Sequence, residues 1–343
     1  MKITTKNRQI WKELFDAAIA FREQKSWTWL MDRDLFGVKD PNSDMISYCC
    51  VMGRLGEVYA LGVYLGTNGY YSYLDLASLT ARSELDQMAI MYDQLMIKIE
   101  FVDNKEADKV DKAAYKALGL KFRGRNQYVQ IRELLPGFLP WYITDEQVVF
   151  LTYVLQQAVE VAERAKTNPK LIPTSGESLL IRIANKEGQN LVWQDTYQEE
   201  PTRDISAIER PINPFLKRKV AGLKKEQAAI CFSYFYIPNP VGNGKKRPFF
   251  AKLALWMVYG NGMIISQAVF QPDDSPEKLD AAFINCFEQL EVIPTQIIIN
   301  SHMAGVAATP ITKAFDLEIY LSPEEEEFGA MDMFLNDGFM GND

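Results

Sequence analysis

The chain has 343 residues, with 37 Lys and Arg against 45 Asp and Glu, and a formal net charge of −8. A single hydrophobic core stops growing near this length, so we expect two domains. The chain is 48% hydrophobic and 24% charged, which is ordinary for a folded protein. No run approaches the roughly 18 apolar residues of a membrane span. We therefore expect a folded chain that crosses no membrane.

The negative charge is concentrated toward the C-terminus. Residues 229–343 contain 6 Lys and Arg against 15 Asp and Glu, which is a net charge of −9. Subtraction from 37 and 45 leaves 31 and 30 for the first 228 residues, which is a net charge of +1. An acidic surface repels a phosphate backbone, so we do not expect nucleic acid to bind the C-terminal half.

The cysteines and the first residues indicate the compartment. The four cysteines have no metal-type spacing, which is typical of a reducing environment. The opening stretch, MKITTKNRQIWKELF, is charged and lacks the apolar run of a secretory signal. We therefore expect a cytoplasmic protein, in which Cys49 and Cys50 are small buried side chains on opposite faces of a strand.

Residues 1–198 predict an α+β domain. Helical periodicity predicts helices over residues 7–24, 68–79, 104–118 and 144–166, and a further helix capped by Ser83. Strand signals cover residues 45–52, 57–66 and 97–103, with two more strands within 178–198. Thr144 and Gln147 have the spacing of a capping box. Residues 26–44, which end in the turn signal Asp40-Pro41-Asn42-Ser43, predict a packed connector.

A basic loop is the most unusual feature of this half. Residues 120–147 combine Arg123-Gly124-Arg125-Asn126 with two later proline turns, which predicts an extended, turn-rich path. Two interpretations stay open. The arginine forks have the geometry to hold a carboxylate or a phosphate, or both arginines pair with the acidic C-terminal domain.

Residues 199–227 are the predicted linker, because they are polar, rich in proline and without a sustained period. Within them, residues 215–225 predict a short basic helix. Residues 228–343 then predict an α/β domain with an acidic tail. Its expected elements are strands at 228–238, 248–260 and 263–270, a helix at 275–290, a strand at 295–300, a helix at 301–315 and a strand at 317–322. The predicted order is β-β-β-α-β-α-β.

Local signals support these boundaries. Gly260-Asn261-Gly262 predicts a type I′ hairpin turn, since Asn-Gly readily adopts the two positive φ angles that this turn needs. Ser275 and Pro276 have the residue types of a helix cap and first helical position. The apolar run at 295–300 suits a buried parallel strand. Residues 323–335 predict a last helix, which begins in the acid run Glu324 to Glu327.

The order of the C-terminal elements resembles the ribonuclease H-like architecture. Nucleases of that class place acidic residues on the first strand, at the end of the fourth and on a late helix, where they hold paired metal ions. Here residues 228–238 contain no carboxylate, and the fourth strand ends in Asn300-Ser301-His302. A neutral amide is a poor ligand for Mg²⁺. We therefore predict no metal, no cofactor and no catalytic residues of this type.

His302 is the only histidine of the chain. A Ser-His-Asp or Cys-His arrangement would have to use it, and no serine or cysteine is tied to it by a motif. A zinc site would have one imidazole available. Neither chemistry is expected.

Four N-terminal segments resemble one domain of a family of uncharacterised bacterial proteins. They are W-K-E-L-F (11–15), S-W-T-W-L-M-D-R-D-L-F-G-V (26–38), Y-C-C-V-M-G-R-L-G-E-V-Y-A-L-G-V-Y-L-G (48–66) and P-G-F-L-P-W-Y-I (136–143). The C-terminal segments P-T-Q-I-I-I (294–299) and L-E-I-Y-L-S (317–322) are similar to the second domain of that family. The resemblance implies a two-domain cytoplasmic protein, and it brings no activity, cofactor or catalytic residue.

No motif of the chain defines an activity, so two hypotheses are carried forward. The first is a non-catalytic interaction or scaffold protein that binds a protein partner. The second is an enzyme or small-anion-binding protein with a site between the two domains. In the second, Arg123 and Arg125 would face Asn300, Ser301 and His302 at the carboxyl end of a parallel strand, where open sheets commonly bind ligands.

Overall fold

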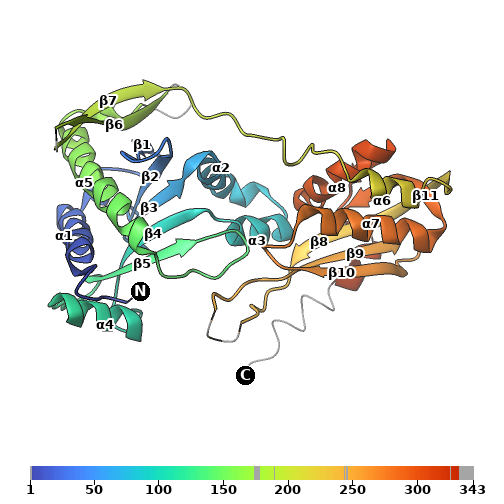
Figure 1. Ribbon diagram of the computed structural model, residues 1–343, viewed down its shortest axis with the longest axis horizontal. Coiled ribbons are helices and arrows are strands. Elements are labelled where there is room, and N and C mark those ends of the chain that lie inside the picture. Colours follow the sequence, from blue (N-terminus) through green and yellow to red (C-terminus); the bar gives the residue numbers. More distant parts are fainter. Residues whose placement is uncertain are drawn as a thin grey trace. The chain divides into compact units, whose positions relative to one another are not determined.

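The computed structural model describes residues 2–173, 178–188, 190–242, 244, 246–324 and 326–331 (Figure 1). The chain forms two compact units. Unit 1 comprises Met1–Leu74, Gln94–Leu135 and Pro140–Arg203, and unit 2 comprises Asp75–Asp93, Pro136–Leu139 and Asp204–Asp343. Two short segments of the N-terminal half therefore belong to unit 2. The domain limits 1–198, 199–227 and 228–343 stay a prediction.

Unit 1 contains a seven-stranded sheet of order β5-β4-β3-β2-β1-β6-β7. The parallel pair β1 and β6 stands among antiparallel neighbours, so the sheet is mixed. The strands are β1 (Phe36–Lys39), β2 (Ile46–Met52), β3 (Ala60–Leu65), β4 (Met96–Val102), β5 (Tyr128–Leu134), β6 (Leu179–Glu187) and β7 (Asn190–Gln198).

Helices cover both faces of this sheet. Helices α1 (Arg8–Gln24), α4 (Lys109–Leu118) and α5 (Asp145–Thr167) share one buried cluster with the inner face of the sheet. Helix α2 (Gly66–Ala77) packs Tyr70 on the other face. Cys49 lies in the first cluster and Cys50 in the second, which confirms the alternation predicted for this pair. Burial raises the pKa of the Cys50 thiol to about 12.

Several local signals of unit 1 are confirmed, and two segments were predicted wrongly. Thr144 and Gln147 form the capping box of α5. The connector predicted at 26–44 contains the 3₁₀ turn η1 (Ser26–Thr28) and strand β1, which has only four residues and so gives little period to detect. The loop predicted at 120–147 contains β5, whose alternating burial was hidden by the glycines and prolines around it. A further 3₁₀ turn, η3 (Pro169–Leu171), follows α5.

Unit 2 contains a five-stranded sheet of order β10-β9-β8-β11-β12. Strands β8, β9 and β10 are antiparallel, whereas β11 is parallel to both β8 and β12. The elements run β8 (Lys224–Tyr236), β9 (Lys252–Val258), β10 (Ile264–Phe270), α7 (Pro276–Leu290), β11 (Val292–Ile299), α8 (His302–Phe315) and β12 (Glu318–Leu321), preceded by α6 (Pro214–Lys219). The chain is thus α+β with two mixed sheets.

The two faces of this sheet are covered by different parts of the chain. Helices α7 and α8 pack on the face that carries Phe232 and Trp256. The opposite face is covered by η4 (Glu326–Met331) and by α3 (Glu84–Tyr92), which follows η2 (Leu79–Ala81). Leu85 of α3 packs in the cluster of Phe235. A helix from the N-terminal half therefore completes the core of unit 2.

Three details of unit 2 differ from the predictions. The β9–β10 hairpin forms, but Gly260 and Gly262 carry its positive φ angles of 98° and 67°, so Asn261 does not take the predicted role. Strand β8 begins at Lys224, inside the predicted linker. The helix predicted at 323–335 is the 3₁₀ helix η4 within the described residues, and 332–335 lie outside them. None of the described helices is long and apolar enough to cross a membrane.

Candidate functional site at the start of helix α8

Asn300, Ser301 and His302 lie where β11 ends and α8 begins. Ile299, the last residue of β11, pairs with Phe232 of the parallel strand β8, which continues to Tyr236, so this is the carboxyl end of β11 beside β8. Asn300 and Ser301 are buried, whereas the His302 side chain is 59% exposed. Open sheets commonly bind ligands at this position, which makes it a candidate site of unit 2.

The carboxylate of Asp86, from helix α3, occupies this corner. Its oxygens accept hydrogen bonds from the backbone N–H groups of His302 at 3.0 Å and Met303 at 3.3 Å. Nδ1 of the His302 ring lies 2.9 Å from Oδ2 of Asp86. The Ser83 hydroxyl donates to the same carboxylate at 3.0 Å. The Asp86 side chain is only 7% exposed, so the contact is internal to unit 2.

The donors in the first turn of α8 are all used. A helix leaves its first backbone N–H groups without intrahelical acceptors, and the resulting positive end attracts anions. In α8 the N–H groups of His302 and Met303 bind Asp86, and that of Ala304 donates to the Ser301 hydroxyl at 3.2 Å. The anion that this helix end would attract is therefore supplied by the chain itself.

Asp86 is held in its ionised form. Burial alone would raise the pKa of this carboxyl, but hydrogen bonds from the His302 ring and backbone, from Ser83 and from Met303 hold the pKa below its ordinary value. An ionised carboxylate only accepts hydrogen bonds, so Nδ1 of His302 must carry the hydrogen between them. Nε2 is then the acceptor whenever the ring is neutral.

A histidine oriented by a carboxylate also occurs in general-base catalysis, where a nucleophile contacts the other ring nitrogen. Among the described residues, no Ser, Thr or Cys side chain makes a hydrogen bond to Nε2 of His302. Ser83 donates to Asp86 instead. Over the same residues, no group of three or more His, Cys, Asp and Glu side chains is arranged to hold a metal ion.

The first strand of unit 2 does contain one carboxylate, because β8 is longer than predicted. Glu226 is exposed and lies on the same strand as Phe232. It pairs with Pro294 near the amino end of β11. Phe232 lies six positions after Glu226 on this strand, which is about 20 Å at the usual rise per residue. Glu226 therefore does not reach the corner at Asn300.

The two predicted arginines lie in unit 1. Arg123 and Arg125 are exposed in the loop between α4 and β5. Gly124 between them has a φ of 107°, and the N–H of Asn126 donates to Asp103 at 2.9 Å, which fixes the turn. No described carboxylate of unit 1 pairs with either guanidinium. The structure thus brings together Asn300, Ser301 and His302, and it places the two arginines in the other unit.

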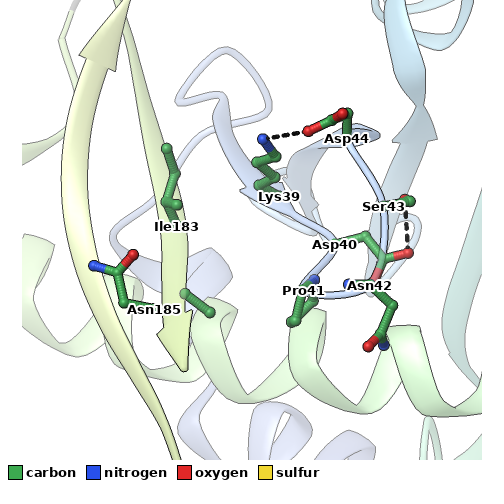
Figure 2. Close-up of a pocket in the computed structure, with 9 residues that line it drawn as sticks. Lys39, Asp40, Pro41, Asn42, Ser43, Asp44, Ile183 and Asn185 are labelled. Atoms are coloured by element: carbon green, nitrogen blue, oxygen red, sulfur yellow. Dashed lines mark hydrogen bonds and ion pairs between the residues drawn. The ribbon is translucent and has the colours of Figure 1, made fainter. Parts of the chain in front are cut away.

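Unit 1 has a polar hollow of about 480 Å³ beside the end of β1 (Figure 2). Its charged groups have partners within the hollow: Lys39 pairs with Asp44 at 2.8 Å, and Asp40 accepts the Ser43 hydroxyl at 2.9 Å. The predicted turn is therefore held by its own side chains. The lining residues are Lys39, Asp40, Pro41, Asn42, Ser43, Asp44, Ile183, Ala184 and Asn185.

Asp86 was missed in the sequence because its position has a local explanation. It follows the N-cap Ser83 by three residues, where an acidic side chain is common in the first turn of a helix. Only the fold brings it to His302, 216 positions away. The residues 183–185 of the hollow were missed for the same reason, whereas its turn was visible in the sequence.

The fold and this corner define an α+β protein of two units, in which a carboxylate from α3 closes a strand end of unit 2. Residues 11–182, half of the chain, match the family described as Domain of unknown function (DUF7309), and the chain belongs to that family. Residues 216–336 match Domain of unknown function (DUF6930). The two matches confirm the predicted two-domain family, and neither description names an activity. No curated protein and no solved structure matches the chain.

Proposed function

We propose that the protein is a non-catalytic interaction protein of the cytoplasm, and that unit 2 is a ribonuclease H-like domain adapted to binding. One observation carries the proposal. The carboxylate of Asp86 fills the corner at the start of α8, where such a domain would hold its metal ions or another ligand. All four cysteines are free and buried, which is consistent with a reducing compartment.

Strand connections support the proposed architecture. Three antiparallel strands, β8 to β10, are followed by α7 and then by β11, which returns parallel to β8. The residues that follow the paired Phe232 and Ile299 on these two strands are Ser233 and Asn300, neither of which is acidic. Paired metal ions need carboxylates at these positions to offset their charge.

The charge of the Asp86 carboxylate at the start of α8 disfavours the binding of an external anion there. A carboxylate at a helix N-terminus is stabilised by about 0.3–1 kcal/mol, and a capping side chain contributes about 1 kcal/mol more. An incoming phosphate would have to displace Asp86 and would meet its negative charge. Binding to a partner is therefore expected on the outer surface of unit 2.

A second candidate function, a hydrolytic enzyme, is favoured by the orientation of His302. Its ring donates through Nδ1 to Asp86 and is largely exposed, so Nε2 has the access to take a proton from a bound water. Hydrolysis of chromogenic esters or phosphate esters that is lost in His302→Gln would support this candidate and overturn the first.

Calorimetry on the whole chain tests the preferred function. Titration with Mg²⁺, Mn²⁺ and inorganic phosphate should give dissociation constants no tighter than about millimolar, as expected for a site without free carboxylates. Micromolar binding of any of the three would overturn the proposal. So would cleavage of an RNA–DNA hybrid that disappears in Asp86→Asn.

A further inference from the structure

Unit 2 has a basic surface around α6, although the rest of the unit is acidic. Residues 204–228 hold six Lys and Arg against three Asp and Glu, a net charge of +3, whereas residues 229–343 have a net charge of −9. Five of the six cations fall between Lys217 and Lys225. The charge is therefore concentrated on one short helix and on the strand end that follows it.

An aromatic side chain stands within this basic surface. Phe215 is 71% exposed, and the Arg218 guanidinium carbon lies 4.2 Å from the centre of its ring. Single exposed apolar residues are common on protein surfaces. A ring stacked with an arginine is a more specific arrangement, because aromatic residues and arginine are the side chains enriched at binding hot spots.

Buried contacts fix the segment that carries this surface. Arg210 makes a two-pronged ion pair to Asp280 of α7 at 2.6 and 2.9 Å, and Asp280 is 1% exposed. Ile212 and Val220, on either side of α6, are buried in the core of unit 2. A partner would thus meet a surface that is already ordered, which lowers the entropic cost of binding.

The cations divide into two groups. Lys217 donates to the carbonyl of Ala314 at 2.8 Å, and Lys225 donates to that of Phe315 at 3.1 Å, as expected at the negative end of a helix. Because both lysines bind carbonyls at the end of α8, α6 lies beside the start of β8. In the described part of the chain, no carboxylate forms an ion pair with the exposed Arg218, Lys219 or Lys224, so their charges are available to the carboxylates of a partner.

We propose that the α6 patch, formed by Phe215, Arg218, Lys219 and Lys224, binds a short acidic segment of a partner protein. Carboxylates of the segment would bind the three cations, and one of its apolar side chains would pack on the phenyl ring. Arginine binds carboxylates through two parallel hydrogen bonds, which makes the contact geometrically specific. The inference rests on the proposed function, since it names the partner chemistry of the same unit.

The size of the α6 patch favours a peptide over a nucleic acid. A nucleic acid gains affinity from many phosphate contacts along an extended basic surface. The patch is confined to α6 and the first residue of β8, and the acidic remainder of the unit would repel the flanking phosphates. The chain's own acid run has a contact elsewhere, because Glu327 accepts the N–H of Gly260 at 2.6 Å.

Fluorescence anisotropy on the full chain tests the α6 patch. The probe is a fluorescein-labelled peptide of glutamates around a central tryptophan, and the same peptide made of glutamines is the uncharged control. Arg218→Glu with Lys219→Glu should weaken binding at least about tenfold, and Phe215→Ser should weaken it several-fold. The matched variant, Lys105→Glu with Lys186→Glu, changes the charge equally at exposed lysines of unit 1 and should bind as the wild type does.

Affinity of the glutamate peptide should also fall as salt is added, because exposed charges are screened. The proposal is overturned if the wild type does not bind the peptide, or if the charge-reversal variant binds it as well as the matched variant does. It is also overturned if single-stranded DNA or anionic vesicles bind more tightly than the peptide and lose binding in the same variant. Self-association that disappears in that variant would assign the surface to a second copy instead.

The outcome is separable from that of the proposed function. None of these variants changes Asp86 or the start of α8. A failure of peptide binding would therefore leave the proposed role of Asp86 intact. Micromolar binding of metal or phosphate by the wild type would instead overturn the proposal that Asp86 fills the start of α8, and it would leave the peptide result unchanged.

Discussion

Tyr92 of α3 stacks on Phe250, with ring centroids 4.0 Å apart and ring planes 9° apart. The two rings are joined through a third segment. The carbonyl of Tyr92 accepts the N–H of Gly137 at 2.8 Å, and the N–H of Phe250 donates to the carbonyl of Gly137 at 2.7 Å. Segments from the N-terminal family region are therefore built into the core of unit 2.

A double-mutant cycle on this stacked pair should show coupling. Phe250→Ala is expected to destabilise unit 2 by about 3–5 kcal/mol, since Phe250 is buried. The interaction energy between Tyr92→Ala and Phe250→Ala should be about 0.5–1.5 kcal/mol, as for other aromatic pairs. Denaturant unfolding of the four proteins measures it, and strictly additive effects would contradict the packing of α3 described above.

A fragment of residues 204–343 should not fold to a stable state alone. Without α3 it would expose Phe235 and Leu255 on the sheet face opposite α7 and α8, together with Tyr236 at the end of β8, all of which are buried in the whole chain. Adding the segment Asp75–Asp93 through a flexible linker should restore folding. Dispersed amide signals in the NMR spectrum of the fragment alone, with no change when the segment is added, would show that α3 is dispensable.

The contribution of Asp86 to stability should depend on pH. Its pKa is lower in the folded chain than in the unfolded chain, where it is about 3.9, so folding favours the ionised form. The stability difference between the wild type and Asp86→Asn should be complete above the unfolded pKa and should vanish as the pH falls through the folded one. Urea unfolding of both proteins from pH 7 to pH 3 measures this, and a difference that grows in acid would contradict the assignment.

Brief proteolysis should first cut within the predicted linker. Residues 202–207 are exposed and belong to no helix or strand, whereas Arg210 is tied to Asp280 and Ile212 is buried. Thermolysin should therefore cleave near Ile205, which is 48% exposed. A first cut inside α5 would contradict the predicted division.

Local chemistry was sufficient to predict most elements of the fold. The caps at Ser83 and Ser275 and the capping box at Thr144 lie where their residue types suggested, because each depends on neighbours within three positions. Strand β1 was missed, since four residues are too few to show the alternating pattern of a strand. Strand β5 was missed among glycines and prolines, which are strong turn signals in isolation.

Long-range placement was beyond the same reasoning. The amphipathic pattern of α3 shows that one face is buried, but it does not show which sheet covers that face. The acidic side chain of Asp86 is explained locally by its own helix, so nothing in the sequence connects it with His302. Arg123 and Arg125 were predicted as a site because a glycine separates them, whereas no sequence motif identifies the carboxylate that fills the strand end.

The central claim is that Asp86 serves as an internal anion at the start of α8. Asp86→Ala should free the N–H groups of His302 and Met303 and leave room for an ion, whereas Asp86→Asn should keep the space filled. The most direct measurement is therefore the melting temperature of the wild type and both variants with and without inorganic phosphate. The account predicts that phosphate raises the melting temperature of Asp86→Ala alone. An equal rise in all three proteins, or none in Asp86→Ala, would contradict it.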